Sequence, residues 1–108
     1  MLGDLVVVGN NVRGGTRLLN LAIALAGDYL NTLLMSANTH NGAATTTSVG
    51  LSNTTGAGAT QVCITGNMLL TAALAKANIN FVEAPATGRW NGVVANNMAG
   101  VLNQPNNV

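Results

Sequence analysis

The chain has 108 residues, of which 48% are hydrophobic and only 6% are charged, and its formal net charge is +1. Ordinary soluble proteins carry about 25% charged residues, and a chain this long forms one domain that buries roughly two thirds of its unfolded surface. The composition therefore predicts a single domain over residues 1–108, excludes a disordered chain because apolar residues are so abundant, and favours association with copies of itself.

The same composition argues against other partners. Four basic residues are too few to follow a phosphate backbone, and three aromatic residues are too few to stack on single-stranded bases. We therefore expect no nucleic-acid partner. The longest apolar run, residues 18–35, is interrupted by polar residues, so we expect no membrane span.

The first residues carry no basic region, and the apolar run 5–8 is too short for the core of a classical signal peptide. We expect synthesis in the cytoplasm, with assembly in the cell, in a virion or in an appendage. Cys63 is the single cysteine, so an internal disulfide is excluded. His40 is the single histidine and has no evident nucleophile or acid beside it, so neither an enzyme nor a metal or other cofactor is expected.

In chain order, a strand is predicted at residues 5–8, followed by a glycine-rich loop. A phosphate-binding loop requires G-x-x-x-x-G-K-[ST], and Gly9, Gly14 and Thr16 occupy three of these places, whereas Gly15 replaces the lysine. Backbone amides at a helix N-terminus bind anions even without lysine. The four residues are thus a possible weak anion site, and a small phosphate- or nucleotide-binding module at residues 9–16 is the alternative function.

A helix is predicted from about residue 16 to residue 37, apolar on almost every side. A domain of this size has too few other elements to cover such a helix, so neighbouring copies are expected to do so. The following segment, residues 38–60, is rich in Thr, Ser, Gly, Asn and Ala and is either a strand with glycine turns or a loop.

Beyond it, the pattern predicts a strand near residues 61–65, a Gly-Asn turn, a helix at 67–77 and a strand at 79–82. The segments "VVVGNN" (6–11) and "VCITGNM" (62–68) echo one another, but two copies are fewer than a repeat array needs. The apolar residues from Trp90 to Leu102 have helical spacing, although Gly92 and Gly100 weaken a helix there.

Together these elements predict an α/β or α+β domain with about three helices and a few short strands. Its expected function is that of a structural subunit of a self-associating homopolymer, such as a filament, ribbon, sheet or shell, without catalysis. Neutral asparagines such as Asn10 and Asn97 are expected to join subunits by hydrogen bonds, without the desolvation cost of ions. The residues predicted to mediate self-association are Leu21, Leu25, Leu33, Leu34, Trp90 and Met98.

Overall fold

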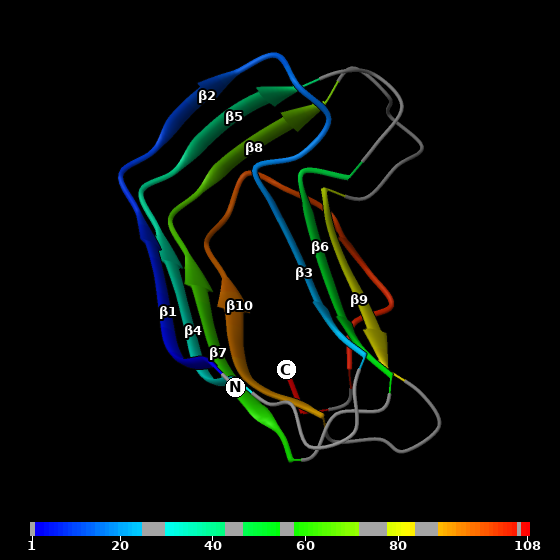
Figure 1. Cartoon of the computed structure of the whole chain (residues 1–108). Coiled ribbons are helices and arrows are strands. Elements are labelled where there is room, and N and C mark those ends of the chain that lie inside the picture. The colour runs from blue at the N-terminus through cyan, green and yellow to red at the C-terminus, as the bar shows by residue number, and fades with distance from the viewer. Residues whose placement is uncertain are drawn as a thin grey trace.

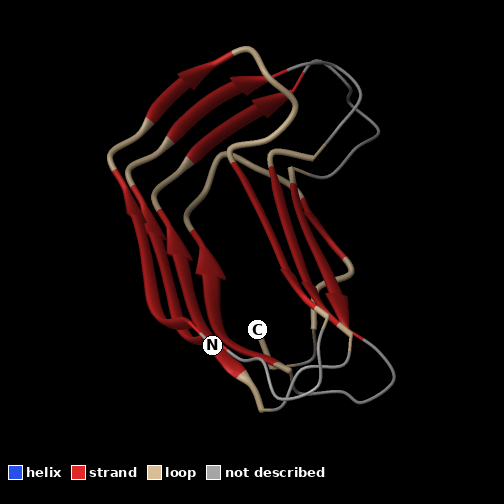
Figure 2. Ribbon diagram, in the orientation of Figure 1, coloured by secondary structure: helices blue, strands red, loops and turns tan. Residues whose placement is uncertain are grey.

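The computed structural model describes residues 2–24, 30–42, 47–54, 58–71, 78–83, 89–105 and 107–108, and within them the chain forms strands and turns (Figures 1 and 2). The strands are β1 (Leu2–Val8), β2 (Asn11–Arg13), β3 (Leu19–Ile23), β4 (Leu30–Ser36), β5 (Thr39–Gly42), β6 (Val49–Asn53), β7 (Thr60–Thr65), β8 (Met68–Thr71), β9 (Ile79–Glu83), β10 (Trp90–Ala95) and β11 (Val101–Leu102).

The strands belong to three sheets in which every pairing is parallel. Sheet 1 has the order β1-β4-β7-β10, sheet 2 the order β2-β5-β8, and sheet 3 the order β3-β6-β9-β11. The chain visits the three sheets in rotation (Figure 1). Each of the first three circuits adds one strand to each sheet, and the described part of the fourth adds β10 to sheet 1 and β11 to sheet 3, with only an isolated bridge, Met68 to Met98, beside sheet 2. This architecture is a parallel β-helix, in which each circuit is one coil.

The predicted α/β or α+β domain with about three helices is therefore wrong, because the described residues contain no helix. The described residues of the longest predicted helix, 16–37, instead contribute β3 and β4, and its residues 25–29 lie outside the described part. In β3 the side chains alternate between the interior and the surface, and Leu21 and Ile23 are buried. Of the predicted helix 67–77, residues 68–71 form β8, and residues 72–77 lie outside the described part. The apolar residues from Trp90 onward, whose spacing suggested a helix, lie in β10, in β11 and in the turn between them.

The predicted strands at residues 5–8, 61–65 and 79–82 fall within β1, β7 and β9. The segment 38–60, for which strand and loop were both open, contributes β5 and β6, while its residues 43–46 and 55–57 lie outside the described part. Within the described residues, no helix is long and apolar enough to cross a membrane.

A ladder of asparagines marks the turn between sheets 1 and 2 in all four coils. Its members are Asn10, Asn38, Asn67 and Asn97, at spacings of 28, 29 and 30 residues by subtraction of their numbers. The side-chain amide of each donates to the Oδ1 of the next, over 2.9, 2.8 and 2.8 Å. Each of these Oδ1 atoms also accepts the backbone N–H of the preceding asparagine, at 3.1, 3.1 and 3.0 Å.

The residue before each ladder asparagine has a positive φ, which turns the chain from one sheet into the next. These residues are Gly9, Ala37, Gly66 and Asn96, with φ of 72°, 54°, 68° and 55°. Glycine and asparagine adopt this conformation at low cost. Asn10 and Asn97, which the sequence suggested as links between subunits, therefore join coils of the same chain.

The interior is filled by rows of apolar side chains that stack from coil to coil. On sheet 1, Val7 aligns with Met35, Met35 with Ile64, and Ile64 with Val94. At the C-terminal side of the stack, Trp90 is fully buried and packs edge-on against Phe81 of sheet 3, with ring centroids 5.7 Å apart. This contact between opposite walls closes the interior at that end.

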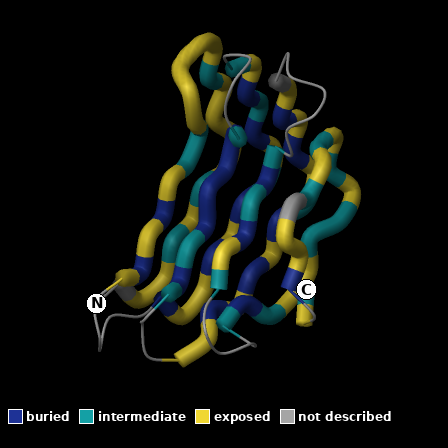
Figure 3. The backbone as a smooth tube through the Cα atoms, turned by 90° about the vertical axis from the view of Figure 1, so that its right-hand side faces the viewer, coloured by how far each residue is buried: buried dark blue, intermediate teal, exposed yellow. Residues whose placement is uncertain are grey.

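The two ends of the stack differ, and they lie on opposite sides of the molecule in Figure 3. At the C-terminal end, Val101 aligns with Ile79, 22 residues earlier, so the last coil is shorter than the others. The tail then returns over β10, where the N–H of Gly92 donates to the carbonyl of Asn107 at 2.9 Å, and Pro105 is buried. Gly92 has φ of 130°, and a Cβ there would lie 2.0 Å from the carbonyl oxygen of Val62, so only glycine fits this position.

Candidate self-association surface

The residues predicted to mediate self-association divide into two groups. Leu21, Leu33 and Trp90 are buried in the interior of this single chain and do not reach its surface. Leu34 and Met98 are exposed, on the outer faces of sheet 1 and of the turn beside sheet 2. Leu25 lies outside the described residues.

The glycine-rich loop, the possible weak anion site, is followed by a strand and not by the helix that the sequence suggested. Gly9 lies in the turn before β2, whereas Gly14, Gly15 and Thr16 follow β2, and the next element is strand β3 rather than a helix. The N–H groups of Gly9 and Gly14 donate to the carbonyls of Ser36 and Asn41 in the next coil, at 3.1 and 2.8 Å. These two amides are committed to holding coils together, and the positive end of a helix dipole is missing here.

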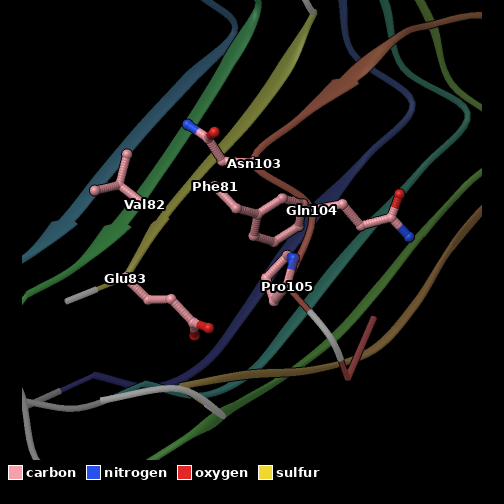
Figure 4. A pocket seen from close by; sticks show the side chains of 6 residues that line it. All are labelled: Phe81, Val82, Glu83, Asn103, Gln104 and Pro105. Atoms are coloured by element: carbon pink, nitrogen blue, oxygen red, sulfur yellow. The ribbon is translucent and has the colours of Figure 1, made fainter. Parts of the chain in front are cut away.

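A pocket of about 340 Å³ lies between β9 and the C-terminal tail (Figure 4). Its lining residues are Phe81, Val82, Glu83, Asn103, Gln104 and Pro105. The charged group in this lining is the carboxylate of Glu83, which accepts the backbone N–H of Arg89 at 2.9 Å. A carboxylate repels phosphate, so the lining of this pocket does not favour phosphate binding.

His40 is fully buried in the interior, between Val12 and Leu69 in register. Its Nε2 lies 3.2 Å from the carbonyl oxygen of Gly14, and its ring packs so closely on Gly42 that a Cβ there would lie 2.4 Å from Cε1. A ring enclosed in this way has no path to a substrate. Within the described part of the chain, no three metal-binding side chains of the His, Cys, Asp or Glu type gather together.

The feature of the surface that stands out is a straight row of apolar side chains across the outer face of sheet 1, which we call the stripe. Its members are Val6, Leu34, Cys63 and Val93, one from each strand of the sheet. Val6 is 62% exposed, Leu34 38% and Val93 52%, and the thiol of Cys63 is free and exposed. Neighbouring parallel strands lie about 4.8 Å apart, so the stripe runs for roughly 14 Å over three strand spacings.

The rows beside the stripe differ in polarity. On one side lies a polar row, Asp4, Thr32, Gln61 and Asn91. There the hydroxyl of Thr32 donates to the carboxylate of Asp4 at 2.6 Å. On the other side lies a row of small or apolar residues, Val8, Ser36, Thr65 and Ala95. Among the residues of these two rows, only Asp4 is charged. A partner that covers the stripe therefore removes few charged groups from water, and the electrostatic cost of burying this apolar surface is small.

Sequence reasoning missed Val6, Cys63 and Val93 as surface residues. The signal that could have found them is the spacing of the ladder asparagines: the stripe residues lie four positions before each of them, at 6, 34, 63 and 93. Aligning the four coils on Asn10, Asn38, Asn67 and Asn97 places these residues in one row.

Comparison of the chain with protein-family models, with curated proteins and with solved structures finds no match in any of the three.

Proposed function

We propose that this protein is a non-catalytic structural subunit that associates with copies of itself, and that the stripe is one of its contact surfaces. The observation that carries the proposal is the exposed apolar row on sheet 1, on a chain with only 6% charged residues. An apolar row exposed on a β-sheet is a typical site of protein association.

A second copy is the partner that fits the stripe best. The row is straight and nearly free of charge, so two copies related by a two-fold axis place the same apolar surface on both sides of the contact. A charged partner would find only one charged group, the carboxylate of Asp4, in the flanking rows, and that carboxylate already accepts the Thr32 hydroxyl.

Two lysines in the stripe are expected to abolish this contact. In the double variant Leu34→Lys/Val93→Lys, each ammonium group must be desolvated when two faces meet, and the dissociation constant of the face-to-face contact should rise at least about 100-fold. Sedimentation velocity over a range of concentrations measures the change. The matched control is Val82→Lys, which adds a lysine at a valine 37% exposed on β9 of sheet 3 and should leave association unchanged.

Cys63 provides a direct probe of the same contact, because it lies in the middle of the stripe. A short bis-maleimide reagent is expected to link two copies of the wild-type chain through Cys63. The variant Cys63→Ser/Val82→Cys carries its thiol on sheet 3 and should give little linked product. Equal linkage of the two proteins, or undiminished association of the two-lysine variant, would refute the proposed contact.

A further inference from the structure

The N-terminal end of the stack is open in a way that the C-terminal end is not. The inward-facing Leu5, Val7 and Leu19 pack on the core but are only half buried, because no described strand covers β1 or β3 on that side. At the opposite end, Trp90 closes the interior and the tail covers β10. Solenoid proteins need a cap at each end to shield the last strands and the end of the core.

The backbone of β1 shows which groups are available at this open edge. The N–H of Gly9 points toward β4, since it donates to the carbonyl of Ser36. Backbone groups alternate in direction along a strand, so those of Val7 and Leu5 point the same way. The N–H and C=O groups of Asp4, Val6 and Val8 therefore point away from the sheet, toward the open side, where the carbonyl of Val8 already accepts the side-chain amide of Asn10 at 3.4 Å.

The devices that usually protect a sheet edge are missing from β1. Exposed edges are blunted by short strands, prolines, lysines or bulges. β1 has seven residues with the sequence LGDLVVV, one of the two longest strands described, and contains neither proline nor lysine. Its one charge, on Asp4, is directed to the outer face, where it accepts the Thr32 hydroxyl.

The difference between the two ends of the stack indicates which partner binds the edge of β1. Another copy cannot offer its own C-terminal end without displacing the tail, because the N–H of Gly92 is bonded to Asn107 and the last coil is shortened. The edge strands at the N-terminal end are β1, β2 and β3, and β1 is the longest of them, so it offers a second copy the most backbone groups for pairing. Two β1 strands related by a two-fold axis pair antiparallel, which places the half-buried Leu5 and Val7 of one copy against those of the other.

We propose that the N-terminal edge of the β-helix binds the same edge of a second copy, through antiparallel pairing of β1 with β1. This contact rests on the proposed structural function and extends it. The stripe alone links copies in pairs, whereas two different two-fold contacts on each copy link them into an open chain. Pairing at β1 also brings the stripes of two copies side by side on one extended sheet, since Val6 is the first member of each stripe.

The substitution Val6→Pro tests the edge without disturbing β4. The N–H of Val6 points to the open side, so proline at this position removes no hydrogen bond between β1 and β4. Proline does remove the N–H donor that a second copy would use, and its ring occupies the edge of the strand. The matched control is Val6→Thr, which shortens the apolar surface but keeps the N–H. Circular dichroism of both variants verifies that the strands are retained.

The experiment is made in the Leu34→Lys/Val93→Lys background, in which the stripe contact is removed. Sedimentation equilibrium should show a species of twice the chain mass of 10.9 kDa and nothing larger. Adding Val6→Pro should raise its dissociation constant at least about tenfold, whereas adding Val6→Thr should change it less than about threefold. Hydrogen exchange of the same background should show the amides of Asp4, Val6 and Val8 protected at high concentration and exposed after dilution.

The outcomes separate the two contacts. A monomeric two-lysine variant, or amides of Asp4, Val6 and Val8 that exchange at the same rate at all concentrations, overturns the edge contact and leaves the stripe in place. Growth of the two-lysine variant into species larger than a dimer overturns both the stripe and the closed pairing of edges. Association that is insensitive to Val6→Pro shows that β1 is not the contact.

Discussion

Replacing Asn67 with alanine is expected to lower the free energy of unfolding by about 4 kcal/mol, because it breaks the asparagine ladder at an inner rung. The Oδ1 of Asn67 accepts both the backbone N–H and the side-chain amide of Asn38, at 3.1 and 2.8 Å. Its own amide donates to Asn97 and to the carbonyl of Met35. Asn38 and Asn67 are 1% and 2% exposed, so water cannot replace these bonds. Urea denaturation followed by circular dichroism measures the loss.

The control for this variant is Asn10→Ala at the first rung. Asn10 is exposed and donates to Asn38, but no described donor reaches its Oδ1, so its removal should cost only about 1 kcal/mol. A loss at Asn67 no larger than that at Asn10 would show that the ladder does not hold the coils together.

Replacing Trp90 with alanine is expected to cost about 4 kcal/mol and to leave the stripe unchanged. Trp90 is completely buried, packs at 71° against the ring of Phe81, and donates its Nε1–H to the carbonyl of Val82 at 3.3 Å. Its removal is expected to leave a cavity between sheets 1 and 3, beside the ring of Phe81. Denaturation measures the stability, and crosslinking through Cys63 reports on association of the folded fraction.

Trp90→Phe is the milder partner of this variant. It keeps an aromatic ring beside Phe81 but loses the hydrogen bond to Val82 and part of the volume, so a loss of about 1 to 2 kcal/mol is expected. The sequence suggested Trp90 as an anchor between copies. That interpretation requires the opposite pattern, in which alanine leaves stability nearly unchanged and weakens crosslinking.

The repeat was visible in the sequence but was read as two copies rather than four. The echo of "VVVGNN" and "VCITGNM" contains Asn10 and Asn67, the first and third rungs of the ladder. The second rung follows Ala37 and the fourth follows Asn96, so the Gly-Asn signature is absent there although both residues have the same positive φ as the glycines. The backbone conformation of these turns is the same in all four coils, whereas the residue before the asparagine varies. A search of the sequence for the dipeptide Gly-Asn therefore finds only two of the four turns.

The prediction of a helix over residues 16–37 was wrong for a related reason. Leucine and alanine dominate the segment, and both favour helices in isolation. In the folded chain, Leu21 aligns with Leu51 and Leu51 with Phe81, so each strand is completed by the coil above it. Local propensity amounts to tenths of a kcal/mol per residue, and burial of a leucine side chain to about 2 kcal/mol, so stacking decides the conformation.

The sequence by itself determined that the chain is apolar, nearly uncharged and punctuated by asparagines at turns, and from these facts came the expectation of self-association. Only the tertiary structure decided which apolar residues are available for it. Leu33 and Leu34 are adjacent and chemically identical, yet one is 1% and the other 38% exposed, because successive side chains of a strand point to opposite faces. Which face is inside depends on the closing of the coil by sheets 2 and 3, far away in the sequence, and no local pattern carries that information.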